Sequence, residues 1–267
     1  MTDAAHQPAD SRISVTRGIR DALQQRHFTQ VPAASYRLTK DLVRPQQSFL
    51  REWDHLELDG YLQNNAGFRR RRFGLFYLGP AGNELLPLPA DTYFQSLDVN
   101  AYAGGITRHF APLTAPFAGN ELLQELIWLF FRQLPIEDDR LSHPWLVDVH
   151  QIRITATAEE QGEPTPEGPH HDGEEFGVIQ LVQRRNVVGG TSTVYDNDGK
   201  PILSCTLTEP MDTLIVWDPH VMHAVSPIRP VDPDEPAIRD TLLIGYDPSP
   251  QLERPLTASL ESAASTD

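Results

Sequence analysis

Cysteine is nearly absent from this chain, since Cys205 is the only one among 267 residues. A single cysteine excludes an intramolecular disulfide, a CxxC redox pair and a metal site built from several thiolates. If the chain binds a metal ion, its ligands must therefore be nitrogen and oxygen atoms.

Positive charge is also scarce. The chain has 22 Lys and Arg residues against 37 Asp and Glu residues, which gives a formal net charge of −15. The densest basic run, Arg69–Arg72, leads directly into an apolar stretch, and we interpret it as a solvated strand edge. Proteins that gain affinity by neutralising phosphates need a larger basic surface. We therefore expect no nucleic-acid partner.

Long hydrophobic runs are missing as well. The longest, Leu126–Phe131, is far shorter than the roughly 18 to 20 apolar residues that span a bilayer. The first residues, Met1–His6, lack the basic and apolar parts of a signal peptide. These features predict a cytoplasmic protein that does not contact a membrane.

The sequence does contain helix patterns and many strand patterns. Apolar residues recur at helical spacing from the N-cap candidate Asn120 to Leu134, and a weaker helix is expected within Thr16–Phe28. Short β-branched or aromatic runs separated by turn residues predict strands. We expect a mostly β fold with flanking helices, arranged as a sandwich or barrel. The predicted strands are Phe73–Leu78, Val147–Thr157, Phe176–Gln183, Thr191–Tyr195, Ile202–Leu207, Thr213–Trp217, Val221–Ser226 and Thr241–Tyr246.

Both ends of the chain are rich in small and polar residues, which predicts flexible segments over 1–15 and 248–267. Between them we expect a single domain, 16–247, with a helical N-terminal part to about residue 140 and a β core over about 145–247. An acidic loop, 159–167, joins two of the predicted strands and is either a lid or a solvated connector.

A candidate metal-binding motif, His170-His171-Asp172, follows this loop. Residues two apart in an extended chain point to the same side, so His170 and Asp172 can present a nitrogen and an oxygen together while His171 faces away. His223, on a later predicted strand, offers a third ligand. Two histidines and a carboxylate on one face of an octahedron form the facial triad of non-heme Fe(II) oxygenases, which leaves positions open for substrates. Taken alone, each histidine is also consistent with a surface or capping residue.

A candidate anion-binding residue, Arg239, lies just before the apolar strand Thr241–Tyr246. Burying an arginine there would be costly unless it met an anion, and its planar guanidinium matches a carboxylate bidentately. That carboxylate could belong to a cosubstrate, and Thr241, on the same side of the strand, could add its hydroxyl. The alternatives are a surface ion pair between Arg239 and Asp240 and ordinary strand packing of Thr241.

Six blocks of this sequence resemble, in the same order, the Fe(II)/2-oxoglutarate-dependent dioxygenases of the bacterial L-isoleucine 4-hydroxylase type. The blocks are Val149–Arg153, His170–Gly173, Asn186–Thr191, Leu207–Leu214, His223–Ile228 and Arg239–Leu243, and Tyr93–Ser96 is similar to a further family segment. The resemblance covers roughly residues 60–247 and is specific, because order, spacing and residue type agree.

The resemblance implies a double-stranded β-helix, a relative of the jelly roll, that holds Fe(II) through His170, Asp172 and His223. It also implies that 2-oxoglutarate is anchored by Arg239, that O2 is consumed, and that ascorbate serves as a reductant in vitro. The implied reaction converts 2-oxoglutarate to succinate and hydroxylates an unactivated C–H bond of a free L-amino acid.

The substrate implied by the resemblance needs contacts of its own. Its carboxylate needs a cation, for which Arg153 is the candidate, with Gln151 on the same face of the strand. A position of Arg153 on the solvent face is the alternative. Its amino group needs an acceptor, which Glu163 or Glu167 of the acidic loop could supply.

Two segments depart from the family pattern, the acidic loop 159–167 and the proline-rich stretch 231–237. We expect both near the mouth of the site, where they leave the substrate open. Three other functions stay possible: a 2-oxoglutarate dioxygenase acting on another small molecule or a peptide-bound side chain, a cupin-type metalloenzyme that does not use 2-oxoglutarate, and a metal-free jelly roll that binds carbohydrate or a partner. His109, His143 and His150 have no assigned role.

Overall fold

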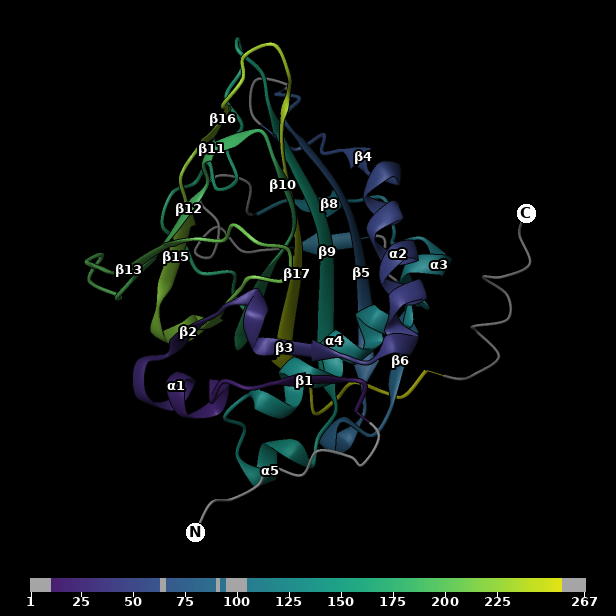
Figure 1. Ribbon diagram of the computed structural model, residues 1–267. Helices are drawn as coiled ribbons and strands as arrows, with labels where there is room; N and C mark the ends of the chain where they lie inside the picture. The colour runs from purple at the N-terminus through teal and green to yellow at the C-terminus, as the bar shows by residue number, and fades with distance from the viewer. Residues whose placement is uncertain (1–10, 63–65, 90–91, 95–104, 256–267) are drawn as a thin grey trace.

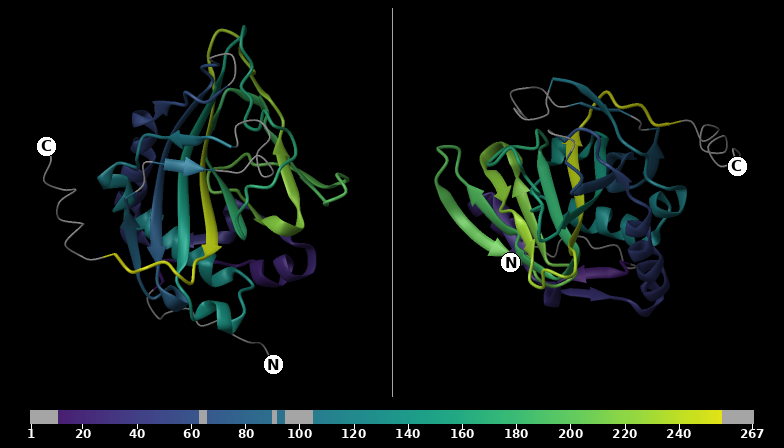
Figure 2. Two further views of the ribbon diagram at one scale, coloured as in Figure 1. Left: turned by 180° about the vertical axis from the view of Figure 1, so that it is seen from behind. Right: turned by 90° about the horizontal axis from the view of Figure 1, so that it is seen from above.

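The computed structural model describes residues 11–62, 66–89, 92–94 and 105–255. At its centre lies a large antiparallel main sheet, which a smaller sheet faces on one side and helices cover on the other (Figures 1 and 2). The strands of the main sheet follow in the order β2 (Phe28–Val31), β14 (Thr213–Trp217), β10 (Phe176–Arg185), β17 (Ala237–Pro248), β9 (Trp145–Ala156), β5 (Arg69–Leu78) and β4 (Glu57–Leu58), with β6 (Leu85–Leu88) paired to β5.

The smaller sheet closes over the inner face of the main sheet. Val194 of the smaller sheet packs in one buried apolar cluster with Ile179 and Leu214 of the main sheet. The smaller sheet consists of β13 (Pro201–Thr206), β12 (Thr191–Tyr195) and β15 (Met222–Val225). Strand pairs β11 (Val187–Gly189) with β16 (Ile228–Pro230), β1 (Ile13–Val15) with β3 (Tyr36–Leu38), and β7 (Thr92–Phe94) with β8 (Thr107–His109) complete the described strands.

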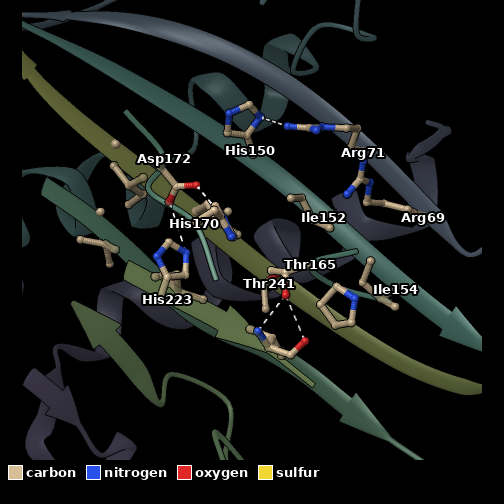
Figure 3. Close-up of a pocket in the computed structure, with 18 of the residues that line it drawn as sticks. Arg69, Arg71, His150, Ile152, Ile154, Thr165, His170, Asp172, His223 and Thr241 are labelled. Carbon is tan, nitrogen blue, oxygen red and sulfur yellow. Dashed lines mark hydrogen bonds and ion pairs between the residues drawn. The ribbon is translucent and has the colours of Figure 1, made fainter. Parts of the chain in front are cut away.

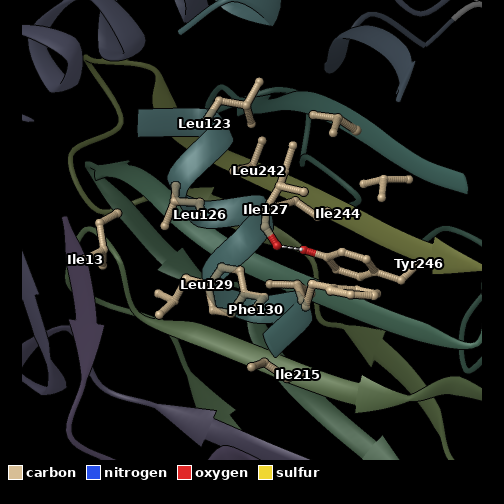
Figure 4. Packing of buried hydrophobic residues seen from close by; sticks show 14 of the residues in the cluster. Ile13, Leu123, Leu126, Ile127, Leu129, Phe130, Ile215, Leu242, Ile244 and Tyr246 are labelled. Carbon is tan, nitrogen blue, oxygen red and sulfur yellow. Dashed lines mark hydrogen bonds between the residues drawn. The ribbon is translucent and has the colours of Figure 1, made fainter. Parts of the chain in front are cut away.

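The outer face of the main sheet is covered mainly by the long helix α4 (Glu121–Gln133) (Figure 4). The helix begins at Asn120, whose side chain accepts a hydrogen bond from the backbone N–H of Leu122 at 2.9 Å, as expected of an N-cap. The Tyr246 hydroxyl of β17 donates to the carbonyl of Ile127 at 2.8 Å and ties the sheet to the helix. The other helices are α1 (Ile19–Arg26), α2 (Val43–Arg51), α3 (Ala115–Ala118) and α5 (Asp138–Leu141), with 3-10 turns at Ala33–Ser35, Lys40–Leu42, Glu52–His55, Pro80–Gly82 and Asp218–His220.

Strand register determines which side chains share the inner face. Across β5, β9 and β17, three rows of directly opposed residues run side by side. Since alternate residues of a strand point to opposite faces, the members of these rows face the interior between the sheets, and their chain neighbours face the helices. The rows are Arg69–Ile154–Arg239, Arg71–Ile152–Thr241 and Phe73–His150–Leu243.

The structure confirms the mostly β fold with flanking helices and the helix that starts after Asn120. The part before residue 140 is not only helical, however, because β2 and β5 join the main sheet. The segment expected to be flexible at the N-terminus is too long, since Ile13 of β1 is fully buried and β1 pairs with β3. No helix in the part of the chain that the structure describes combines the length and apolar character needed to cross a bilayer.

Candidate active site

His170, Asp172 and His223 converge on one point between the two sheets, as the sequence predicts (Figure 3). One candidate ligand atom from each residue lies within 4.8 Å of the other two. Nε2 of His170 is 3.3 Å from one oxygen of Asp172, and Nε2 of His223 is 3.4 Å from the other. Two imidazole nitrogens and a carboxylate in this arrangement match the donor set of a facial Fe(II) site.

Backbone pairing holds the triad together. His170 and His223 form an isolated antiparallel bridge, with N–H to carbonyl distances of 3.1 and 3.0 Å. Nδ1 of His170 lies 2.8 Å from the carbonyl of Gly168, and a proton on Nδ1 leaves the Nε2 lone pair directed at the site. His171 points away and bonds through Nδ1 to the carbonyl of Asp218, 2.6 Å away. The alternation expected at His170-His171-Asp172 is therefore present.

Asp218 fixes the loop that carries Asp172. Its carboxylate accepts hydrogen bonds from the backbone N–H groups of Asp172 and Gly173 at 3.0 and 2.9 Å. Asp218 is buried, and burial together with the negative charge of Asp172 raises the pKa of its carboxyl to about 6. No motif in the sequence marks Asp218 as part of the site.

The charges of the triad are strongly coupled. Burial raises the pKa of Asp172, but the interaction with His223 and the hydrogen bond and charge of His170 outweigh burial and leave that pKa well below its usual value. Burial lowers the pKa of His170, yet the Asp172 carboxylate and then Glu167 outweigh it and raise the pKa to about 9. For His223 burial dominates and lowers the pKa to about 4. The Asp172 carboxylate is thus ionised and the His223 imidazole neutral, as metal binding requires, whereas His170 carries a second proton that a metal ion would displace.

A cavity extends from the triad across the inner face of β17, β9 and β5. Its walls combine apolar side chains with several charged ones, a mixture typical of a small-molecule site. Besides the triad, residues that line it include Arg69, Arg71, Tyr93, Arg108, His150, Ile152, Ile154, Pro164, Thr165, Glu167, Glu174, Ile179, Val225, Arg239, Thr241 and Leu243.

Arg239 and Thr241 both line this cavity and are each 2% exposed. Nε and Nη2 of Arg239 have no hydrogen-bond partner among the described residues. Burial and the nearby positive charge of Arg184 lower the pKa of Arg239 to about 10. A buried guanidinium with unsatisfied donors is costly, so this position is suited to an anion. The surface ion pair between Arg239 and Asp240 is not formed, since Asp240 faces the other side of the sheet.

Arg153 and Gln151 do not line the cavity, and the prediction that they contact the substrate is not supported. They occupy β9 positions that alternate with His150, Ile152 and Ile154, and therefore face the outer side of the sheet. Arg153 instead bonds to both carboxylate oxygens of Asp240 at 2.8 Å.

Of the two loop glutamates, only Glu167 lines the cavity, with a carboxylate oxygen 3.7 Å from Nε2 of His170. Glu163 accepts a hydrogen bond from Gln161 at 2.7 Å and lies outside the lining. The loop is fastened to the strands rather than free, because Gly162 pairs with Ile228 and the Thr165 hydroxyl bonds to Val225. No residue of 231–237 is among those that line the cavity.

Two features were missed or misread in the sequence. Arg69 and Arg71 are 7% and 6% exposed and line the cavity, so the interpretation of Arg69–Arg72 as a solvated edge is wrong for its odd-numbered members. His150, left without a role, is also buried in the cavity wall and accepts a hydrogen bond from Arg71 at 2.6 Å. Of the segment Tyr93–Ser96, Gln95 and Ser96 lie outside the described residues.

A model of the 2OG-Fe dioxygenase family matches residues 50–245. An L-isoleucine-4-hydroxylase from Bacillus thuringiensis is 29% identical over 160 residues, which are 59% of this chain and 65% of that protein, slightly less than two thirds of its length. A 3(1)-hydroxy-L-isoleucine 4-dioxygenase from Pantoea ananatis is 24% identical over 84% of this chain and 93% of that protein.

Solved structures agree with these matches. A bsmA homolog from Methylobium petroleophilum PM1 has a TM-score of 0.73 and 28% identity over 87% of this chain and 94% of that chain. IDO from Bacillus thuringiensis has a TM-score of 0.71 and 20% identity over 88% of this chain and 95% of that chain, which is evidence for the fold alone. The predicted double-stranded β-helix is thereby confirmed.

Proposed function

The chain belongs to the 2OG-Fe dioxygenase family, and from that premise we propose that it hydroxylates an unactivated C–H bond of a free L-amino acid. Enzymes of this family use Fe(II), 2-oxoglutarate and O2, and 2-oxoglutarate is decarboxylated oxidatively to succinate. The observation that carries the proposal is the presence, in one cavity, of a His–Asp–His group and a buried guanidinium with unsatisfied donors.

In this proposal His170, Asp172 and His223 hold the iron. Bound Fe(II), with 2-oxoglutarate and O2, supplies the oxidising chemistry. The carbonyl of Gly168 keeps the proton of His170 on Nδ1, and Asp218 keeps the Asp172 loop in place. These contacts orient the ligand atoms before any metal is bound, which reduces the cost of forming the site.

Arg239 and Thr241 would hold the far carboxylate of 2-oxoglutarate. Arg239 offers a planar pair of donors that the described residues leave unsatisfied, and Thr241 lies on the same face of β17, two residues on. A carboxylate bound there would relieve the cost of burying the guanidinium. The unsatisfied donors of Arg239 also favour an enzyme that uses 2-oxoglutarate over a cupin-type enzyme, because Arg239 would have no anionic partner in the latter.

A free amino acid is supported as the substrate by two further points. The names of the Bacillus and Pantoea relatives refer to L-isoleucine and to a hydroxylated L-isoleucine. In this chain Ile152, Ile154 and Leu243 supply aliphatic wall, and Glu167 is a carboxylate suited to accept the amino group. A reactive site hydroxylates the carbon that is held in front of it, so these walls determine the product.

The test is an assay of the purified protein with Fe(II), 2-oxoglutarate, ascorbate and a pooled set of L-amino acids, read by succinate formation and mass spectrometry. The expected result is one or a few amino acids heavier by one oxygen atom, with stoichiometric succinate. Succinate without a heavier amino acid would refute the amino-acid substrate and point to another small molecule or a peptide-bound side chain. Iron-loaded protein that forms no succinate would refute the proposed reaction altogether.

A further inference from the structure

Three arginines line the cavity at the end opposite Arg239, on elements that the proposed iron and 2-oxoglutarate sites do not use. Arg69 and Arg71 come from β5, and Arg108 comes from β8. Their side chains are buried together, each residue being 7% exposed or less. The buried carboxylate of Asp59 bonds to Nε of Arg69 at 2.7 Å and lies 3.6 Å from Nη1 of Arg71. Glu167 adds a second negative charge near Arg108. Among the described residues that these contacts join, three guanidinium groups thus meet the two carboxylates of Asp59 and Glu167.

Neighbouring side chains hold Arg71 in place, but they do not satisfy all of its hydrogen-bond donors. Its Nη2 donates to Nδ1 of His150 at 2.6 Å, and its guanidinium carbon lies 3.9 Å from the centre of the Phe110 ring. The Nε of Arg71 has no partner among the described residues. Burial and then the charge of Arg69 lower the pKa of Arg71 to about 10, and the opposing effect of Asp59 offsets only part of this.

His150 is in the form that can accept this bond. Burial, and then the charge of Arg71, hold its pKa well below the usual value, so the imidazole is neutral. Its ring is stacked on Phe73 at 4.7 Å and lies edge-on to Tyr93 at 5.0 Å, while Nε2 is 3.4 Å from Asp148. This packing fixes the direction of the Arg71 guanidinium, as expected of a binding group held by its neighbours.

The arginines lie at a distance from Arg239 that suits a second anion. In the rows of opposed residues, Ile154 separates Arg69 from Arg239 and Ile152 separates Arg71 from Thr241. Two strand spacings put the backbones about 10 Å apart. Isoleucine side chains thus line the cavity between the two charged ends. The triad lies across the cavity from Arg71 (Figure 3).

We propose that Arg71, supported by Arg69 and Arg108, binds the carboxylate of the substrate, while Arg239 binds that of the cosubstrate. This inference rests on the proposed function, and it narrows the substrate to small aliphatic molecules with a free carboxylate. An amide or a peptide-linked residue would leave the arginine cluster without its anion. The carboxylate at Arg71 directs the aliphatic part over Ile152 toward the triad.

The test is a binding titration on protein loaded with Fe(II) and 2-oxoglutarate in the absence of oxygen. The probes are L-isoleucine, L-isoleucinamide and 3-methylpentanoate, which separate the contributions of the carboxylate and the amino group. The two acids are expected to bind at least about 30-fold more tightly than the amide, because the amide has no carboxylate to pair with the buried Arg71. Arg71→Gln should abolish this difference without changing the affinity for 2-oxoglutarate.

A matched control is Arg70→Gln. Arg70 is the next residue of the same strand, is exposed and faces the other side of the sheet, so its loss should leave all affinities unchanged. If Arg71→Gln does not fold, as judged by its thermal melting, Arg71→Lys keeps the charge but not the planar fork and should reduce acid binding about tenfold.

The outcomes distinguish this inference from the proposed function. Equal binding of acid and amide to the unchanged protein, or no binding of either acid, would overturn the inference even if an amino acid were hydroxylated. If Arg71→Gln lost its affinity for 2-oxoglutarate but kept its preference for acids over the amide, the arginine cluster would belong to the cosubstrate site instead. Acids that bind through Arg71 but are not hydroxylated in air would support the inference and refute the proposed function.

Discussion

On its outer face the main sheet packs aliphatic and aromatic side chains against α4, whereas on its inner face the same strands carry arginines, histidines and carboxylates. Strand β17 shows both: Leu242, Ile244 and Tyr246 belong to the apolar core, and Arg239 and Thr241 line the cavity. Burial of apolar area stabilises the outer face without any ligand. The inner face buries unsatisfied donors and repelling charges, so its stability and its activity both depend on what it binds.

The largest difference between the effects on activity and on stability is expected when one carboxylate of the inner face is removed. Asp172→Ala should abolish 2-oxoglutarate turnover, because a metal ligand is lost. The variant should still fold but with a lower melting temperature, because the pKa of Asp172 lies well below its usual value and its ionised form therefore stabilises the native state at neutral pH. Succinate formation and thermal melting measure the two effects. Asp234→Ala, at an exposed site, is the control, and unchanged turnover in Asp172→Ala would refute the triad.

The reverse experiment disrupts the outer face. Phe130 of α4 is fully buried in the apolar core, so Phe130→Ala should cost about 3 to 5 kcal/mol of unfolding free energy. Urea unfolding measures the loss, and the folded fraction should keep its KM for 2-oxoglutarate. Leu50→Ala, at a position that is 45% exposed, should change stability little. A marked rise in the KM of Phe130→Ala would show that the two faces are not independent.

A smaller inner-face effect is expected for Arg239→Gln. Loss of the charged pair with the far carboxylate should raise the KM for 2-oxoglutarate about 30-fold or more. The ligand-free protein should be no less stable, because the variant removes a buried guanidinium whose donors lack partners among the described residues. Steady-state kinetics and melting of the same sample test both statements. An unchanged KM would show that Arg239 does not bind 2-oxoglutarate.

The smallest effect is expected for Arg153→Met on the outer face. Arg153 bonds both oxygens of Asp240, which is fully buried, so its loss should cost about 1 to 3 kcal/mol near neutral pH while KM values stay constant. Burial already raises the pKa of Asp240, so protonation of that carboxyl on acidification should diminish the loss. Urea unfolding at neutral and acidic pH gives the comparison. A raised KM for the amino acid would show that Arg153 contacts the substrate after all.

The parts of the molecule that followed from the sequence are those with strong local signals. The apolar residues of α4 recur at helical spacing behind a capping Asn120, and all those predicted to lie on the stripe from Leu123 to Leu134 are buried. His170 and Asp172 share a side of the chain because they are two residues apart, which a single strand dictates. Arg239 stood out because a charged residue beside an apolar strand needs a partner.

The errors concern strand faces, which local sequence does not decide. Alternation shows that Arg153 and Ile152 point to opposite sides, but the neighbouring strands determine which side faces the cavity. Arg69–Arg72 looked uniformly polar, although a strand through it must place Arg69 and Arg71 on the side of Phe73. That alternation was the available signal for the buried arginines. The loop folding that brings Glu167 rather than Glu163 to the cavity depends on contacts with β15 and β16, and no local pattern encodes it.

We propose that the inner face holds iron at the triad and two carboxylates at two separate arginine sites. A crystal structure of the oxygen-free complex with Fe(II), 2-oxoglutarate and L-isoleucine, with anomalous scattering to locate the iron, tests it most directly. We expect iron in contact with His170, Asp172 and His223, the far carboxylate of 2-oxoglutarate on Arg239, and the isoleucine carboxylate on Arg71. Iron bound elsewhere, or both carboxylates at one arginine site, would contradict it.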